Sequence, residues 1–155
     1  RIVAEDLARG SVFCEWGSGL GGVTILASLL GFEASGIEYH RHLVDAARQL
    51  AEDLHTDASF AHGTFLMPGD EDLVAHSEHM QPETSLAAYD ELGLTLAGCD
   101  LVFVYPWPGE EQLVDDLFQR HTTPGALLLS FHDDTRLLVQ RHMGADVELM
   151  PLGWM

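Results

Sequence analysis

The sequence predicts an α/β protein built on a doubly wound, mostly parallel sheet. Short apolar runs rich in β-branched and aromatic residues alternate along the chain with segments of helical periodicity. A glycine-rich turn, GSGLGG at residues 17–22, stands between the first of these strands and the helix that follows it. With 155 residues, 46% of them hydrophobic, the chain has the size of a single domain, 1–155, with a packed core.

The first half of the chain is expected to form a helix at 1–9, a strand at 12–15, a helix at 23–30, a strand at 34–39, a helix at 42–54 and a strand at 58–62. Apolar residues share one face of the first and third helices, which is the pattern of an amphipathic helix. The second helix is apolar all round, as a helix buried against a sheet is, and Gly31 ends it. The strands are short apolar runs, which suit a buried parallel sheet.

The second half is expected to form a strand at 100–105, a helix at 110–121, a strand at 126–132, a short helix at 133–142 and a last strand at 147–152. Residues 66–99 break the alternation, because they are polar at first, helical near 85–92, and long for a simple connection. They form either a crossover helix with a loop or a lid. The last strand is expected at an edge of the sheet that is truncated at the C-terminus.

The charge of the chain limits its partners. There are 25 acidic residues against 7 basic ones, all arginines, which gives a formal net charge of −18. Such a field repels nucleic acid and anionic membranes, so neither is expected as a partner. It is compatible with a basic partner surface or a positively charged small ligand, and it also serves solubility.

Cysteine usage and hydropathy favour a cytoplasmic protein. Cys14 and Cys99 both lie in apolar runs, so we expect free thiols in a reducing compartment. No apolar run approaches the length of a membrane span, and no charged-then-apolar leader opens the chain. The nine histidines show no zinc-module spacing, so no metal site is predicted.

The glycine turn fits two fingerprints at once. Gly17, Gly19 and Gly22 fit G-x-G-x-x-G, which is typical of a nicotinamide or flavin dinucleotide site. With Glu15, the glycines Gly17, Gly19 and Gly21 fit E-x-G-x-G-x-G, which is typical of an S-adenosylmethionine site. In both cases the turn brings the free amides of a helix N-terminus close to the ligand.

Two acidic residues bear on which ligand is bound. Glu38 closes the second strand, where a carboxylate can accept hydrogen bonds from both hydroxyls of a ribose in either ligand. Glu15 ends the first strand, where a carboxylate would repel a pyrophosphate but attract the ammonium group of S-adenosylmethionine. The local charge therefore favours S-adenosylmethionine over a dinucleotide.

On these motifs the sequence resembles the class I S-adenosylmethionine-dependent methyltransferases. The resemblance runs from Val12 to about His132 and is carried by EWGSGLG at 15–21, GIEYH at 36–40, HGTF at 62–65 and DLVFVYPWPGE at 100–110. It implies the Rossmann-like methyltransferase fold, S-adenosylmethionine as cofactor, and methyl transfer to a small-molecule or protein acceptor. The cofactor is then expected across the carboxyl ends of the strands.

The resemblance also implies roles for individual residues. It places Glu15, Gly17, Ser18, Gly19 and Gly21 around the methionine portion of the cofactor. It implies that Glu38 binds the ribose and that Tyr39 packs beside the adenine. It places Thr64 and Phe65 near the adenine amine. Threonine departs from the acidic residue that is usual there, although its hydroxyl can accept one hydrogen bond.

Candidate catalytic residues come from YPWP at 105–108 and from the end of the strand at 126–132. Tyr105 and Trp107 offer aromatic faces that attract cations, beside the expected position of the methyl group. His132 follows the strand at 126–132 and has the pKa of a general base, if one is needed. Two alternatives stay open: an NAD(P)-dependent oxidoreductase, and a cofactor-binding or interaction domain without activity.

Overall fold

Seven strands form one sheet in this computed structural model, which describes residues 2–132, 136–144 and 147–150. The strands are β1 (Val12–Trp16), β2 (Glu33–Glu38), β3 (Ser59–His62), β4 (Leu101–Val104), β5 (Leu127–His132), β6 (Arg136–His142) and β7 (Val147–Met150). Their order across the sheet is β3-β2-β1-β4-β5-β6-β7. The first five are parallel, β6 is antiparallel to β5, and β7 is antiparallel to β6.

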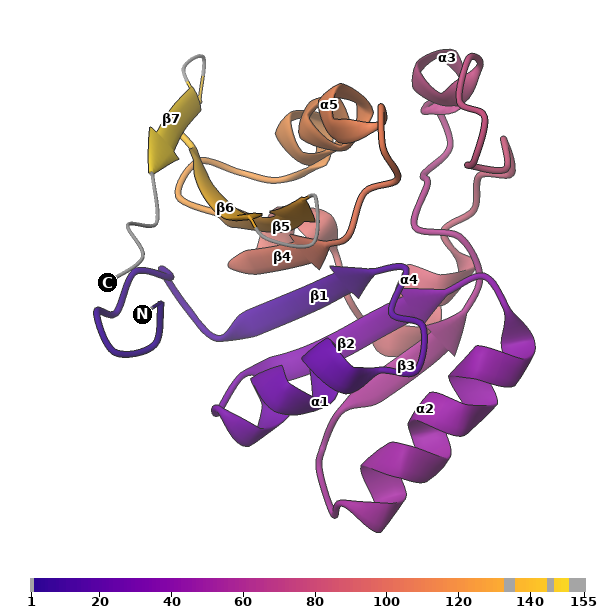
Figure 1. Cartoon of the computed structure of the whole chain (residues 1–155), viewed down its shortest axis with the longest axis vertical. Coiled ribbons are helices and arrows are strands. Elements are labelled where there is room, and N and C mark those ends of the chain that lie inside the picture. The colour runs from indigo at the N-terminus through magenta and orange to yellow at the C-terminus, as the bar shows by residue number, and fades with distance from the viewer. Residues whose placement is uncertain (1, 133–135, 145–146, 151–155) are drawn as a thin grey trace.

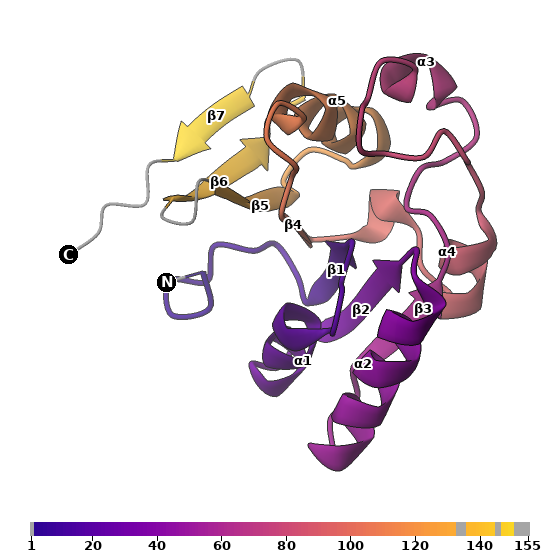
Figure 2. The ribbon, with the colours of Figure 1, turned by 45° about the vertical axis from the view of Figure 1, so that its right-hand side comes forward.

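Helices cover both faces of the sheet, which makes it doubly wound (Figure 1). The helices are α1 (Gly22–Leu29), α2 (Arg41–Asp53), α3 (Glu71–Val74), α4 (Ala87–Leu92) and α5 (Glu111–His121), with a 3₁₀ turn at Leu96–Gly98. Helices α1 and α2 pack on one face, and α3, α4 and α5 belong to the other (Figure 2). The predicted fold class is therefore confirmed.

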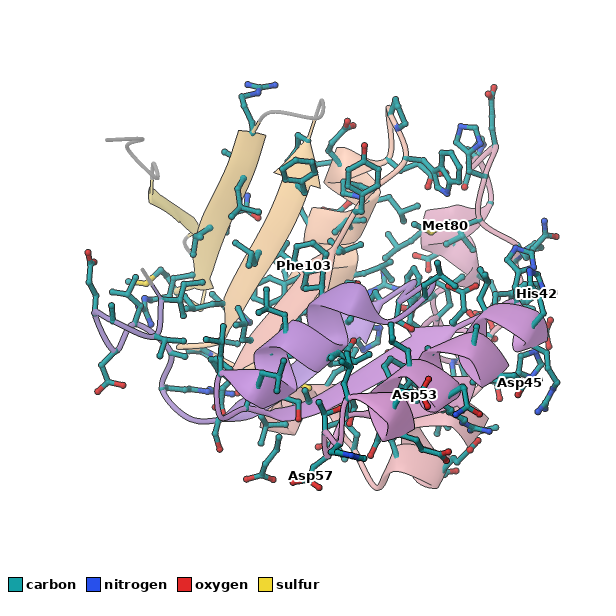
Figure 3. The ribbon with its side chains drawn as sticks, turned by 60° about the horizontal axis from the view of Figure 1, so that its bottom comes forward. His42, Asp45, Asp53, Asp57, Met80 and Phe103 are labelled. Carbon is teal, nitrogen blue, oxygen red and sulfur yellow. The ribbon has the colours of Figure 1, made fainter. Side chains whose placement is uncertain are left out.

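Two apolar layers hold the helices to the sheet. On the α1–α2 face, Phe13 and Phe103 pack under α1, and Phe60 packs under α2. On the opposite face, Trp16 and Phe118 are fully buried, with α4 and α5 over them. Figure 3 shows Phe103 between the sheet and α1, whereas Asp45 and Asp53 lie on the outside of α2. The alternation of side chains along each strand supplies both layers.

Three expected helices need correction. Residues 2–6 form turns rather than a helix, since Asp6 has a left-handed φ of 51° and the segment is too short to hold a helix alone. Helix α1 is not buried all round, because Leu26 and Leu29 are 55% and 63% exposed. Residues 136–142 are strand β6 rather than a helix, while 133–135 lie outside the described residues.

Strand β6 forms because β5 offers it a complete ladder. All six residues of β5 pair with β6, from Leu127 with Arg141 to His132 with Arg136. Pairing satisfies the backbone groups along the outer side of β5, and this outweighs the weak helical pattern of the segment. The expected last strand is confirmed as β7, which pairs with β6; residues 151–152 lie outside the described residues.

Candidate functional site

The glycine turn joins β1 to α1 through three left-handed residues. Gly17, Gly19 and Gly21 have φ angles of 70°, 54° and 79°, which side chains rarely adopt. The amides of Gly17 and Ser18 both donate to the carbonyl of Ile37, at 2.9 and 3.0 Å, and so tie the turn to the end of β2. The sequence needs glycine here because the chain must reverse tightly between a buried strand and a helix.

The glycines of the turn divide into two kinds. A Cβ at Gly21 would lie 2.5 Å from Cζ of Phe60 and 2.9 Å from Cβ of Ala47, so this glycine permits α1 to approach α2 and β3. A Cβ at Gly17 or Gly19 would meet no heavy atom within 4 Å. The bend around Gly17 and Gly19 therefore leaves open space beside bare backbone, where a ligand can come close.

Glu38 is held in place by the backbone at the carboxyl end of β2. It is only 7% exposed, and its two oxygens accept hydrogen bonds from the amides of Gly19, at 2.9 Å, and His40, at 2.8 Å. A carboxylate oxygen has a second lone pair, so both oxygens can still accept from a ligand hydroxyl. The side chain is thus oriented before any ligand arrives.

A pocket of about 450 Å³ opens at the carboxyl ends of β1, β2, β3 and β4. Gly17, Glu38 and Tyr39 form one side of it, and Tyr105 and Trp107 form the rim after β4. The remaining side comes from residues 63–86, which we name the wall segment. This segment runs from the end of β3 through α3 to the start of α4 (Figure 2).

Aromatic rings set the shape of the pocket. Trp16 and Phe65 stack at its floor, with ring centroids 5.2 Å apart and planes within 8°. The ring of Tyr105 stacks on Phe131 at 5.6 Å, and that of Trp107 lies against His79 at 5.1 Å. Tyr105 and Trp107 are 52% and 57% exposed, so both rings are partly accessible at the rim of the pocket.

The wall segment is fixed at several points. Tyr89 of α4 donates to the carbonyl of Phe65 at 2.7 Å, and Thr84 donates to Glu71 at 2.7 Å. Tyr39, at the end of β2, reaches across and donates to Glu83 at 3.2 Å. This last bond links the two sides of the pocket at its rim.

Glu15 lies behind the turn rather than in the pocket. It is 5% exposed, and its carboxylate accepts hydrogen bonds from the amide of Thr24, at 2.9 Å, and from the Thr24 hydroxyl. Burial raises its pKa from 4.5 to about 7; the Thr24 bonds act in the opposite direction, and the charge of Glu38 adds to the rise. Glu15 thus supports the first turn of α1 from within the protein.

The described residues include neither a candidate metal site nor a candidate membrane-spanning helix. Within residues 2–132, 136–144 and 147–150, no group of three or more His, Cys, Asp or Glu side chains could hold a metal ion. No helix in this part of the chain is long and apolar enough to cross a bilayer.

Comparison with known proteins rests on structure. No protein-family model matches the sequence, and no curated protein matches it significantly. Among solved structures, an RNA methyltransferase from Salinibacter ruber in complex with S-adenosyl-L-homocysteine matches 83% of this chain and 69% of its own, at 20% identity and a TM-score of 0.57. A tRNA (uracil-54, C5)-methyltransferase from Pyrococcus abyssi, also with S-adenosyl-L-homocysteine, matches 84% of this chain at 20% identity and a TM-score of 0.50.

A third structure, a precorrin-6y C5,15-methyltransferase from Geobacter metallireducens, matches 83% of this chain at 15% identity and a TM-score of 0.51. This chain has the class I S-adenosylmethionine-dependent methyltransferase fold. The match covers 28% of the tRNA methyltransferase and 60% of the precorrin methyltransferase, so the chain spans less than two thirds of each.

Within this methyltransferase fold, the pocket gathers most of the residues predicted from sequence. Gly17, Glu38, Tyr39, Thr64, Phe65, Tyr105 and Trp107 all line it. Four residues of the turn motif do not line it: Glu15, Ser18, Gly19 and Gly21. Ser18 is buried against the position that a Cβ of Gly36 would take, and Gly19 acts through its bond to Glu38. Their contact with a cofactor stays a prediction.

His132 does not line the pocket. Its Nε2 lies 2.7 Å from the hydroxyl of Ser130, on the same face of β5 and two residues before it. By the alternation of side chains along β5, His132 lies on the same face of the sheet as Leu128, which is the face that α5 covers. A role for His132 as a base therefore stays a prediction.

Sequence reasoning missed part of the site. Trp16 lines the floor, His40 lines the side formed by the end of β2, and His79, Met80 and Gln81 line the wall. Met80 lies toward the end of the sheet at which α2 begins, which is the end opposite to Asp57 (Figure 3). The length of residues 66–99 was the available signal, but no motif within them points to a ligand.

Proposed function

We propose that this chain transfers a methyl group from S-adenosylmethionine to a small-molecule or protein acceptor. The observation that carries the proposal is the pocket beside the glycine turn, lined by the oriented carboxylate of Glu38, in a chain with this fold. Structures of the same fold are described as complexes with S-adenosyl-L-homocysteine, the product that remains after the methyl group is lost.

The residues of the pocket fit the parts of this cofactor. Glu38 accepts hydrogen bonds from the ribose hydroxyls, and the exposed ring of Tyr39 packs beside the adenine. Thr64 and Phe65 lie at the end of β3, where they meet the adenine edge. The open backbone at Gly17 receives the methionine portion, and Glu15, Ser18, Gly19 and Gly21 shape that backbone from behind.

When bound, S-adenosylmethionine supplies an electrophilic methyl carbon: a lone pair of the acceptor bonds to it as the carbon–sulfur bond breaks, and the bonding pair stays on sulfur. The chain's own task is to align the acceptor and to exclude water. Tyr105 and Trp107, each more than half exposed, present aromatic rings to the acceptor at the rim. His132 is proposed as the proton acceptor only for acceptors that must lose a proton, reached through a water molecule.

The charge of the chain narrows the acceptor class. The Salinibacter and Pyrococcus proteins are described as RNA and tRNA methyltransferases. A net charge of −18 opposes the phosphate contacts on which nucleic-acid binding depends. We therefore propose a small-molecule or protein acceptor rather than a nucleic acid.

Calorimetric titration tests the proposal directly. We expect saturable binding of S-adenosylhomocysteine and S-adenosylmethionine, and no binding of NADH under the same conditions. Tight binding of NADH alone would overturn the proposal in favour of an oxidoreductase. Binding of S-adenosylmethionine without methyl transfer to a broad panel of acceptors would instead favour a binding domain without activity.

The carboxylate of Glu38 is expected to contribute strongly to cofactor affinity. Glu38→Gln removes the charged acceptor and keeps an oxygen for only one of the two backbone amides, so S-adenosylhomocysteine should bind with about 1–3 kcal/mol less free energy, or about 5- to 150-fold more weakly. The matched control is Glu33→Gln, which removes the same charge from the exposed opposite end of β2. Equal affinity in both variants would show that the ribose site lies elsewhere.

A further inference from the structure

A second cavity of about 400 Å³ lies beside the first, between the wall segment and the beginning of α5. His76, Ser77, Glu78 and His79 come from the wall segment, and Pro108 and Glu110 come from the connection between β4 and α5. None of the proposed cofactor-binding residues lines it, so the function proposed above leaves this cavity unexplained.

The second cavity is lined by the buried carboxylate of Glu110. The Glu110 side chain is 6% exposed, so it is largely withdrawn from water. One oxygen accepts hydrogen bonds from the hydroxyl of Ser77 and from the amide of His79. The other oxygen, Oε2, is buried and has no hydrogen-bond donor among the residues that the structure describes. An unpaired buried carboxylate oxygen is costly, because a charge withdrawn from water needs a partner.

Among the described residues, neither arginine nor lysine lines the cavity beside Glu110. The side chains that line the cavity include two glutamates and two histidines but no arginine, and the chain contains no lysine. Arg120 lies at the opposite end of α5, where it forms ion pairs with Asp70 and Asp72 of the wall segment. A positively charged ligand group would therefore meet uncompensated negative charge in this cavity.

The second cavity adjoins the pocket at one residue. His79 lines both cavities, and its ring lies against Trp107, which forms the rim of the first. Trp107 and Pro108 are consecutive, and each faces one of the two cavities. A ligand with a cationic group in the second cavity can therefore extend past the Trp107 ring toward the first.

We propose that the second cavity binds the cationic ammonium group of the methyl acceptor, with Oε2 of Glu110 as its counter-ion. The assignment of this ligand as the acceptor rests on the methyltransferase function proposed above. The cation-binding site itself rests on the geometry of Glu110 alone. Glu110 is thus a specificity-determining residue that selects amine-bearing acceptors over neutral ones of the same shape.

Binding of a simple diamine tests this site in the intact chain. We expect 1,4-diaminobutane to bind saturably to the complex with S-adenosylhomocysteine, as measured by calorimetry, and 1,4-butanediol to bind at least 10-fold more weakly. The amide NMR signals of residues 109–113 should shift during the diamine titration. Equal affinities for the two compounds, or shifts that avoid these residues, would overturn the proposal.

Charge removal tests Glu110 specifically. Glu110→Gln keeps an acceptor for Ser77 and His79 but loses the charge, so diamine affinity should fall at least 10-fold. Asp116→Asn removes one charge from an exposed position of α5, the helix that follows Glu110, and should change the diamine affinity less than twofold. Equal effects would mean that only the general field attracts the diamine, and the site would be rejected. If Glu110→Gln does not fold, the amide shifts of the wild-type chain decide.

The same measurements separate this inference from the proposed function. Each protein is first titrated with S-adenosylhomocysteine alone. Cofactor binding without diamine binding overturns the Glu110 site and leaves the methyltransferase proposal standing. Diamine binding at residues 109–113 without cofactor binding supports the cation site and overturns the assignment of its ligand as a methyl acceptor.

Discussion

Replacing Gly21 by alanine is expected to lower the free energy of unfolding by about 2–5 kcal/mol. Gly21 has a φ of 79°, and an L-residue in that conformation costs about 1–2 kcal/mol. The added Cβ would also lie 2.5 Å from the Phe60 ring and 2.9 Å from Ala47. Both neighbours are buried, so α1 must move away from α2 and β3, and such overpacking costs about 1–3 kcal/mol.

Urea unfolding followed by circular dichroism measures this loss, and Gly19→Ala provides the matched control. Gly19 has a φ of 54°, but its Cβ would meet no heavy atom within 4 Å. The free energy of unfolding of this variant should therefore fall only by the cost of placing alanine at a positive φ, about 1–2 kcal/mol. Equal losses in the two variants would contradict the packing role that we assign to Gly21.

Glu15 is expected to make the protein less stable as the pH rises. Its pKa is 4.5 in the unfolded chain and about 7 in the folded one, so between these values the folded protein holds a proton that the unfolded chain releases. The stabilising contribution is complete below pH 4.5, falls as the pH rises, and is lost above pH 7. At 1.36 kcal/mol per pKa unit, the total loss is about 3 kcal/mol.

The variant Glu15→Gln isolates this effect from the other carboxyl groups. Glutamine still accepts hydrogen bonds from Thr24 but does not titrate. The stability of the wild-type protein, minus that of the variant, should fall by about 2–3 kcal/mol between pH 5 and pH 8. Parallel pH profiles from urea unfolding would mean that the carboxyl group titrates normally and that its burial costs little.

The parallel half of the sheet was predictable because its strands are buried on both faces. Such strands appear in a sequence as apolar runs, and LVFV of β4 and LLLSFH of β5 are examples. The glycine turn was predictable for a different reason, since few residues other than glycine tolerate a positive φ. The position of Glu38 was predictable because it is the acidic residue that closes the second strand.

The antiparallel edge could not be predicted from local pattern. Residues 136–142, RLLVQRH, have no strict alternation, and their conformation is decided by the free side of β5 rather than by their own propensities. The burial of the Glu15 carboxylate could not be predicted from local pattern either, and its role toward a cofactor stays a prediction. The sequence places it beside the turn, but only the fold shows that its carboxylate faces Thr24.

The second side of the pocket was also beyond sequence reasoning. His79, Met80 and Gln81 lie in a segment without strong periodicity, and their position depends on distant contacts such as those of Glu110 and Tyr39. Glu110 itself looked like an ordinary residue at the start of a helix. The role that we propose for it rests on its burial and on an oxygen without a donor in the described structure.

The wall segment supplies much of the lining without contributing a strand to the sheet. Evolution can therefore vary its length and side chains while the hydrogen-bonded ladders stay intact. Homologous proteins with the same sheet would therefore differ in the ligands that their pockets bind before they differ in fold. Exchanging residues 63–86 between such homologues would change the lining of the pocket while the sheet is kept.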